Sequence, residues 1–291
     1  MTYEHSIAAI DEESVLVECG PMRLVIRAWN GGQPQIMLAR QAAKESISYL
    51  ERIAHWRSKL SRPIPQIEEL PEDKLALNMI AGTAAIGDDD LTPLAAVAGT
   101  IADAVADWLF ERGATRVIVE NGGDIAIRLK AGETTTVGVR PQVNSRHISH
   151  VIRLDGRQPS WGVTTSGFGG RSLTRGIASA VTVLAAKASV ADAAATAIGN
   201  ACFVEDGRVV QLPAESLDPS TDLAGLLVTT EVGELLPGKV LKAIESARQK
   251  AELLAQRKII YGAFIALQNV FAISDGLKSY ISSDSGSGGQ R

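Results

Sequence analysis

The order of apolar and polar positions predicts strands first and helices after them. Val15 to Trp29 alternates and is rich in β-branched or bulky residues, with Gly20 and Pro21 in its middle, so we expect two strands around a turn. From Pro34 to Leu60 apolar residues recur at helical spacing, and the pattern stops before the proline-rich stretch Arg62 to Pro71. This predicts a long amphipathic helix, followed by a shorter helix from Glu72.

The middle of the chain predicts an alternation of helices and strands. Thr92 and Pro93 have the chemistry of an N-cap and a first helical residue, and Gly113 provides a stop, so we expect an alanine-rich helix between them. A small-residue helix is expected from Val190 to about Ala201. Strands are expected at Ala114–Val119, Ile125–Lys130, Thr134–Arg140 and Ser179–Ala185, the first three pairing with one another.

The last third predicts a hairpin, a strand and a long helix. Asp206-Gly207 is typical of a turn, here between Ala201–Val204 and Val209–Leu212. A strand is expected in Leu223–Glu231 and a helix in Pro237–Ala255, while the apolar stretch Lys258–Ile273 fits either structure. The chain is therefore expected to be an α/β (α+β) protein, with sheet layers packed against alanine-rich helices. We expect one domain over residues 1–280 and a disordered polar tail over 281–291.

Composition excludes several classes of partner and site. The formal net charge is −4 and no run of lysine and arginine is interleaved with aromatics, so nucleic acid is not an expected partner. Two cysteines provide neither a disulfide framework nor a structural zinc site, which favours the reducing cytoplasm. The start of the chain lacks the pattern of a signal peptide, and the apolar run Ile259–Ile273 is too short and too interrupted for a membrane span.

The turn Asn121-Gly122-Gly123-Asp124 is the first candidate site. Two glycines between apolar strands remove the Cβ atoms that would keep a ligand away from the backbone. The same sequence is also typical of an ordinary hairpin turn, and spacing alone favours that interpretation. If a ligand does approach the turn, a Cβ at Gly123 should weaken its binding.

The second candidate is the helix face that carries Asp192 and Thr196, which are four residues apart among alanines. A carboxylate and a hydroxyl on one face suit a hard cation such as magnesium. Ser189 and Asp192 also have the spacing of a capping box, and spacing alone favours this alternative.

A loop dense in hydroxyls and glycines lies between these two segments. It runs from Gly162 to Ser172, includes Thr165-Ser166-Gly167, and carries one guanidinium at Arg171. Such a loop could present amides and a cation to a phosphate, or it could be an ordinary surface loop. The acidic run Asp88–Asp90 lacks the spacing of an EF-hand, and the four histidines show no metal-ligand spacing.

In this order the motifs resemble the ApbE superfamily, whose members transfer the FMN part of FAD to a Thr or Ser of a target protein with magnesium. The resemblance runs through AAVAG at Ala95 to Gly99 with Asp103, NGGDI from Asn121, TSG from Thr165, VTV from Val181 and ADAAATA from Ala191. It implies metal ligation and catalysis by Asp192 and Thr196, with the backbone carbonyl of Val97 as a third ligand. It also implies binding of FAD by seven residues: Asn121, Gly122, Gly123, Asp124, Thr165, Ser166 and Gly167.

Three segments differ from the flavin transferases. Ala98 stands where those proteins have a lysine, Cys19–Met22 replaces their MGT motif, and Ser172–Ala180 replaces their HIIDP motif. In these respects the chain is closer to the uncharacterised ApbE-related UPF0280 family. The resemblance thus leaves two kinds of function open: FMN transfer to a hydroxyl of a protein acceptor, or a divergent role without it. The divergent role would be in one-carbon carrier or sulfur amino acid metabolism, or in non-enzymatic binding of a nucleotide or metabolite. A homo-oligomer also stays open.

Overall fold

A ten-stranded antiparallel sheet runs through the molecule in the computed structural model, which describes residues 3–284. Its strand order is β1-β2-β3-β5-β6-β9-β10-β13-β14, with the short β4 paired to β3. The strands are β1 (His5–Ala9), β2 (Ser14–Cys19), β3 (Met22–Asn30), β4 (Gln33–Pro34), β5 (Arg116–Asn121), β6 (Asp124–Leu129), β9 (Ser160–Ser166), β10 (Ala180–Ala185), β13 (Gly262–Leu267) and β14 (Val270–Ile273).

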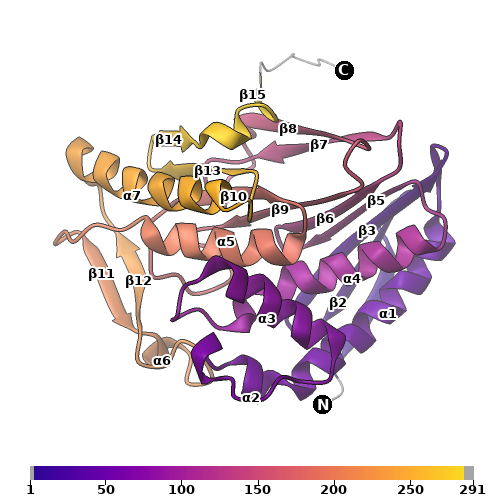
Figure 1. Ribbon diagram of the computed structural model, residues 1–291, viewed down its shortest axis with the longest axis horizontal. Coiled ribbons are helices and arrows are strands. Elements are labelled where there is room, and N and C mark those ends of the chain that lie inside the picture. Colours follow the sequence, from indigo (N-terminus) through magenta and orange to yellow (C-terminus); the bar gives the residue numbers. More distant parts are fainter. Residues whose placement is uncertain (1–2, 285–291) are drawn as a thin grey trace.

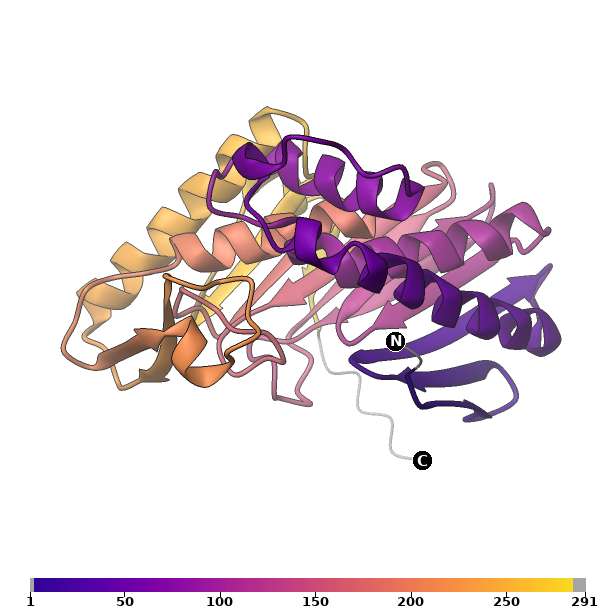
Figure 2. The same ribbon diagram turned by 90° about the horizontal axis from the view of Figure 1, so that it is seen from below.

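Helices cover one face of this sheet (Figure 1). The five long ones are α1 (Ile36–His55), α3 (Lys74–Ile86), α4 (Val97–Glu111), α5 (Ala188–Ala201) and α7 (Pro237–Gln256). Alternate strand residues such as Val117 and Val119 are fully buried in a core shared with helix residues such as Val105 and Leu109. Seen from below, the helices form a layer along the sheet, and α4 and α5 lie in its middle (Figure 2).

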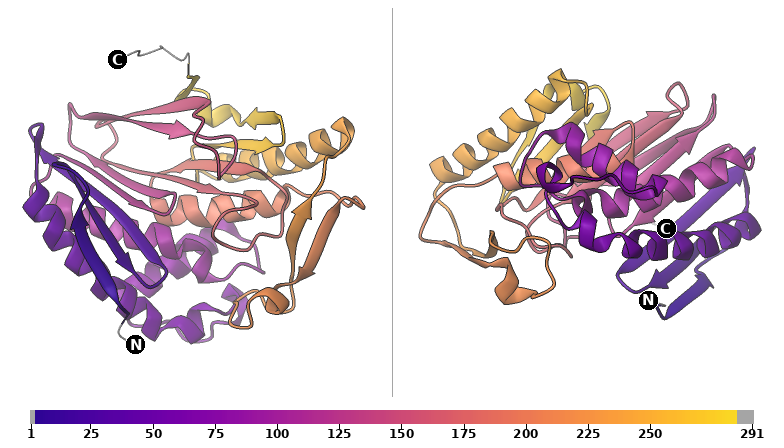
Figure 3. Two further views of the ribbon diagram at one scale, coloured as in Figure 1. Left: turned by 180° about the vertical axis from the view of Figure 1, so that it is seen from behind. Right: turned by 60° about the horizontal axis from the view of Figure 1, so that its bottom comes forward.

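A small sheet covers part of the opposite face (Figure 3). It consists of β7 (Thr134–Val139), β8 (His150–Asp155) and β15 (Ile281–Ser283). A separate buried cluster fills the space between the two sheets, and it includes Ile127, Trp161 and Phe264. The main sheet is therefore buried on both sides over its central strands, with helices on one side and a second sheet on the other.

A two-stranded arm extends from the body, formed by β11 (Val209–Pro213) and β12 (Leu227–Val232) with the short α6 (Ala214–Leu217) between them. The expected pairing of Val209–Leu212 with Ala201–Val204 is wrong. The chain before the turn is still helical up to Ala201, because the small-residue pattern of α5 continues to that point, and β11 finds its partner further along the chain.

Other predictions are confirmed or corrected in the same way. Both strands around Gly20, the long helices and β5, β6 and β10 lie close to their expected positions. The segment Thr134–Val139 pairs with β8 and not with β6, because Gly132 turns the chain out of the main sheet. Ile281–Ser283, expected in the tail, form strand β15 against β8, and residues 285–291 lie outside the described part.

One helical segment, Pro93–Glu111, is long and apolar enough to cross a membrane by length and composition. In the fold it packs against α1, α5 and the strands β5 and β6, and 56% of the segment is buried. Its apolar character is therefore explained by its central position in the helix layer.

Candidate functional site

Helices α4 and α5 cross closely near their N-terminal ends. A Cβ on Gly99, in the first turn of α4, would overlap the carbonyl of Ala188 at the start of α5. Glycine is required here because two backbones meet, and the close approach brings each helix start within reach of side chains on the other. The two helices use this proximity to satisfy each other's free amides.

Asp103 of α4 satisfies the free amides at the start of α5. Its carboxylate accepts hydrogen bonds from the amides of Ala188 and Ser189 at 3.1 and 2.9 Å, and from the Ser189 hydroxyl at 2.9 Å. It also forms an ion pair at 2.9 Å with Arg128 of β6, which is only 3% exposed. A buried charge is tolerated because a cation and three donors surround it.

Asp192 of α5 makes the reciprocal contact, since its Oδ2 accepts a hydrogen bond at 2.9 Å from the amide of Gly99. The expected capping box of Ser189 and Asp192 is therefore wrong. The N-cap position of α5 is Lys187, which makes no capping side-chain bond, and the Ser189 hydroxyl donates to Asp103. Asp192 is directed away from its own helix start, towards the start of α4.

The turn Asn121 to Asp124 joins β5 and β6 at the same place. The Asn121 amide donates to the carbonyl of Ala98 at 3.2 Å, one residue before the amide that Asp192 binds. Gly122 and Gly123 have positive φ angles of 69° and 131°, which only glycine adopts without strain. The turn is thus an ordinary two-residue hairpin connection, which is one of the two interpretations that the sequence allowed. It also lies against the α4–α5 crossing.

The carboxylates of Asp124 and Asp192 influence each other's ionisation. Burial and then the neighbouring Asp192 raise the pKa of Asp124 well above its ordinary value, and the guanidinium of Arg171 opposes this. Burial raises the pKa of Asp192 to about 7, although hydrogen bonds from the amides of Gly99 and Ala98 act in the other direction. The two segments singled out in the sequence therefore meet in one site.

The Thr165-Ser166-Gly167 segment ends β9 and is divided between the two faces of the sheet. Thr165 lies opposite Thr182 of β10, and their hydroxyls are 2.9 Å apart on the side of the outer sheet. Side chains alternate along a strand, so Thr164 and Ser166 are on the helix side. There Thr164 lies directly opposite Asp124. Of the predicted pair of hydroxyl ligands, only Ser166 faces the site.

Thr164 is a residue that the sequence interpretation missed. It is fully buried, and its hydroxyl has no hydrogen-bond partner within residues 3–284. A buried hydroxyl without a partner is uncommon, and this one belongs to the residue that pairs with Asp124. The sequence does not show which of the neighbouring residues Thr164 and Thr165 faces the helices, because this depends on which side of the sheet each alternate side chain of the strand occupies.

Thr196 and Val97 complete the predicted metal ligands. Thr196 lies one turn after Asp192 on α5, and both residues are only partly buried while the alanines around them are buried. Val97 is the first residue of α4, at the helix end that Asp192 contacts. Helical geometry directs its carbonyl along α4 towards the amide of Ile101, so Val97 has the weakest support of the three.

Arg171 is a second residue that was not assigned to the site, although it is the single guanidinium of the glycine-rich loop. Its Nη2 donates to the carbonyl of Pro21 at 2.6 Å, in the turn between β2 and β3. Its Nη1 lies so close to Gly122 that a Cβ there would be 2.8 Å away. A cation therefore lies across the hairpin turn, on the side of Asp124.

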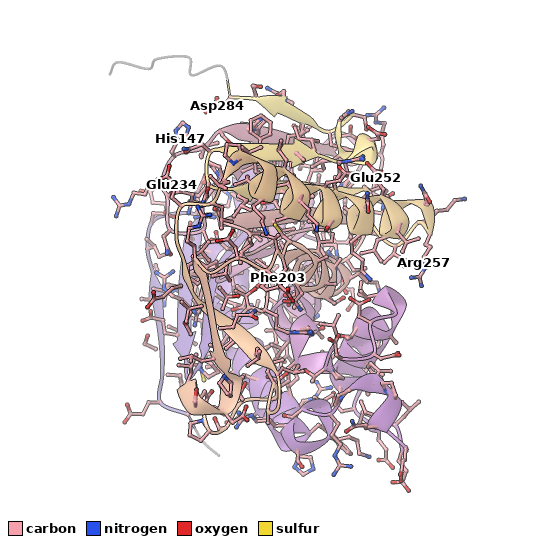
Figure 4. All side chains as sticks on the ribbon, turned by 90° about the vertical axis from the view of Figure 1, so that its left-hand side faces the viewer. His147, Phe203, Glu234, Glu252, Arg257 and Asp284 are labelled. Carbon is pink, nitrogen blue, oxygen red and sulfur yellow. The ribbon has the colours of Figure 1, made fainter. Side chains whose placement is uncertain are left out.

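The remaining candidates lie elsewhere. Asp88 and Asp90 form ion pairs with Lys250 and Arg175, so the acidic run ties the helix layer to the rest of the fold. His150 is buried against Phe264 and Phe271 on the outer-sheet side, and burial lowers its pKa. Figure 4 shows His147 at the rim of the molecule near Asp284, whose amide donates to Ser149.

No three side chains of His, Cys, Asp or Glu within residues 3–284 gather closely enough to hold a metal ion by themselves. A cation at this site would instead use one or two carboxylates, the Thr196 hydroxyl and oxygens of the ligand. This is the coordination that magnesium commonly has beside substrate phosphates.

Two solved structures share the whole fold. The flavinyl transferase ApbE of Pseudomonas stutzeri aligns with a TM-score of 0.51 over 97% of this chain and 99% of that one, at 13% identity. The ApbE protein of Thermotoga maritima aligns with a TM-score of 0.52 over 96% and 99%, at 15% identity. At such identities the likeness concerns the fold alone.

Curated relatives are UPF0280 proteins of methanogens. That of Methanococcus vannielii is 32% identical over 160 residues, which are 55% of this chain and 65% of the relative. That of Methanococcus aeolicus is 40% identical over 109 residues, or 37% and 44%. The chain thus spans less than two thirds of these relatives. The family model described as AbpE bacteria matches residues 7–276. The chain therefore belongs to the AbpE bacteria family and is an ApbE-like protein similar to the UPF0280 proteins.

Proposed function

We propose that this protein binds FAD together with Mg²⁺ at the α4–α5 crossing and transfers the FMN part to a hydroxyl group of an acceptor. The observation that carries this proposal is the pair of neighbouring carboxylates, Asp124 and Asp192, each with a raised pKa. Two like charges in a buried place are unfavourable unless a cation joins them. The name of the Pseudomonas stutzeri protein that shares the fold, a flavinyl transferase, adds support for a flavin substrate.

The residues present fit a magnesium ion. Asp192 is a carboxylate whose Oδ2 accepts from the Gly99 amide, and the Thr196 hydroxyl lies on the same helix face, so both oxygen-bearing groups are available to one cation. The buried hydroxyl of Thr164 offers a further polar group beside Asp124. When bound, magnesium would neutralise charge on the phosphates of the substrate.

The chain's own residues would position the reacting groups. The hydrogen bonds from Gly99 to Asp192 and from Asn121 to Ala98 hold helix α4, helix α5 and the hairpin turn in one arrangement. The acceptor oxygen forms a bond to the flavin-side phosphorus, and the bond to the AMP oxygen breaks with its electron pair leaving on AMP. Asp124, whose carboxylate has no hydrogen bond within the described residues, takes the proton of the acceptor hydroxyl.

The experiment is to mix the purified protein with FAD and to follow bound flavin and released AMP. Magnesium is compared with EDTA, and the Asp192→Asn variant is compared with the parent. We expect flavin retention and AMP release only for the parent with magnesium. Absence of flavin binding by the parent would reject this function.

A divergent role without FMN transfer is the second candidate, and the segment Ser172–Ala180 favours it. Arg175 of this segment pairs with Asp90 and donates its amide to Asn200 at 3.2 Å, while the Thr174 carbonyl accepts from Thr229. These contacts lie at the far end of α5, so the segment supports the fold there. Such a protein would bind a nucleotide in one-carbon carrier or sulfur amino acid metabolism, or without catalysis. Flavin binding without AMP release would favour this alternative.

A protein acceptor, a homo-oligomer and a cytoplasmic location stay predictions of the same proposal. Cys19 and Cys202 are both buried free thiols.

A further inference from the structure

We propose that Arg171 is the residue that binds the phosphate groups of the ligand, and that Gly122 is glycine so that Arg171 can lie across the turn. This inference rests on the proposed function, because it names the part of the substrate that the same site recognises. It concerns the side of the hairpin turn that Arg171 covers.

The geometry around Gly122 is the first argument. The Nη1 atom of Arg171 would lie 2.8 Å from a Cβ at Gly122, whereas a Cβ at Gly123 would meet only the Thr165 carbonyl at an ordinary 3.7 Å. Both glycines have positive φ angles, but only Gly122 also makes room for a side chain. The turn and the arginine are therefore matched to each other.

The bonds that Arg171 makes are the second argument. Nη2 donates to a neutral acceptor, the Pro21 carbonyl, and within residues 3–284 the guanidinium forms no ion pair. Arg128 and Arg175, in contrast, are paired with the carboxylates of Asp103 and Asp90. A guanidinium held at one edge by a carbonyl keeps donors for a second, anionic partner.

The surrounding charges identify the class of that partner. Nη1 of Arg171 lies against Gly122, and Asp124 follows two residues later at the start of β6, so the guanidinium and the carboxylate border the same turn. A ligand that carries phosphates could contact the guanidinium with one group and a cation on Asp192 with another. A planar guanidinium suits such oxygens because it donates two parallel hydrogen bonds. We therefore infer a diphosphate-containing ligand.

The loop holds Arg171 in place through backbone contacts. The Asn144 side chain donates to the Gly169 carbonyl at 2.9 Å, and the Phe168 amide donates to the Ala178 carbonyl at 2.7 Å. Arg171 itself is exposed, so its removal leaves these anchors intact. This makes Arg171→Ala a variant that should fold.

The test compares the binding of FAD, inorganic pyrophosphate and riboflavin, each with Mg²⁺, to the parent, Arg171→Ala and Arg171→Lys. Arg157→Ala is the control, because Arg157 is an arginine with a 91% exposed side chain in the β8–β9 turn. Loss of one charge-assisted contact should weaken FAD and pyrophosphate binding about tenfold. Riboflavin, which has no phosphate, should bind equally to all four proteins. Lysine should recover part of the loss, and the binding of Mg²⁺ alone should remain.

Equal affinities of the parent and Arg171→Ala for both phosphate ligands would overturn this inference and leave a structural role for the Pro21 contact. A parent that binds pyrophosphate but not FAD, with the same dependence on Arg171, would reject the flavin function and keep the arginine. A parent that binds neither phosphate ligand would overturn both.

Discussion

The two faces of the main sheet are both buried, but they are stabilised by different interactions. On the outer-sheet side, aromatic rings pack against one another: Trp161 is tilted against Tyr261 at 5.3 Å and edge to face with Tyr280 at 5.6 Å between centroids. On the helix side at the α4–α5 crossing, small residues bring backbones together and carboxylates satisfy the helix starts. Aromatic packing needs no ligand. The carboxylate arrangement leaves charges that a cation would stabilise.

Strand β9 shows how one segment contributes to both faces. Thr165 donates or accepts a hydrogen bond with Thr182 on the outer-sheet side, while Thr164 lies opposite Asp124 on the helix side. The difference teaches that neighbouring hydroxyls in one motif can have unrelated roles. Substitutions on the two sides of the sheet should therefore affect stability and ligand binding separately.

Asp103→Ala should have the largest effect. It leaves Arg128 buried without one of its carboxylates and removes three hydrogen bonds at the start of α5. Removing one partner of a buried ion pair costs about 3–5 kcal/mol of unfolding free energy. Because α5 carries Asp192 and Thr196, magnesium affinity should fall as well. Denaturant unfolding and magnesium titration of the folded variant measure both.

Phe264→Leu is the control from the outer-sheet side, where Phe264 is fully buried and stacked with Phe271. It should lower stability by roughly 1–3 kcal/mol and leave magnesium affinity unchanged. A loss of magnesium affinity in Phe264→Leu equal to that in Asp103→Ala would contradict the separation of the two faces.

The stability of the metal-free protein should depend on pH through the site carboxylates. The folded pKa of Asp192 is about 7, above the ordinary 3.8, and that of Asp124 is also raised. The folded state therefore binds protons more tightly, so this contribution to stability is present below pH 4 and is lost as the pH rises through about 7. Thermal unfolding from pH 4 to 8 should show a falling Tm, and saturating magnesium should oppose the fall near pH 7.

The double variant Asp124→Asn, Asp192→Asn is the control for this slope, since it removes both titrating groups. If its Tm falls with pH as steeply as that of the parent, the slope comes from other groups and the proximity of the two carboxylates has no energetic consequence.

Thr165→Val should have the smallest effect of these changes. It removes one partly buried hydroxyl whose partner is Thr182, so stability should change by about 1 kcal/mol or less. Ligand and magnesium affinity should stay at the parent's values, because the side chain faces the outer sheet. Ser166→Ala, one residue along on the helix side, should weaken ligand binding. The opposite pattern in the two variants would show that the face assignment is wrong.

The sequence predicted the order of most elements, because helical and strand periods are local properties. Alternation in β2 and β3 and the alanine-rich pattern of α4 and α5 correspond to real elements. The partners of strands were harder to predict. Nothing local in Thr134–Val139 indicates a second sheet, and the polar composition near Ile281 hid a short strand that pairs with β8.

Only the parts of the site that depend on local spacing could be predicted from the sequence. The spacing of Asp192 and Thr196 places them on one helix face, and the glycines of the hairpin mark a turn with positive φ. The meeting of these segments depends on the crossing of α4 and α5, which only tertiary structure decides. Asp103 caps a helix that begins 85 residues later in the sequence. Arg171 lies against a turn 49 residues earlier. No local pattern specifies contacts over such separations.

Titration of Mg²⁺ into the parent and Asp192→Asn, with FAD present, measures directly whether Asp192 is a metal ligand. Asparagine keeps an oxygen that can accept from the Gly99 amide, so the variant should lose about 1 kcal/mol of stability or less. It loses the charge that a hard cation requires, so magnesium affinity should fall by at least about tenfold, with Thr196→Val showing a parallel loss. Unchanged magnesium affinity in a folded Asp192→Asn would contradict the metal site and, with it, the proposed transfer of FMN.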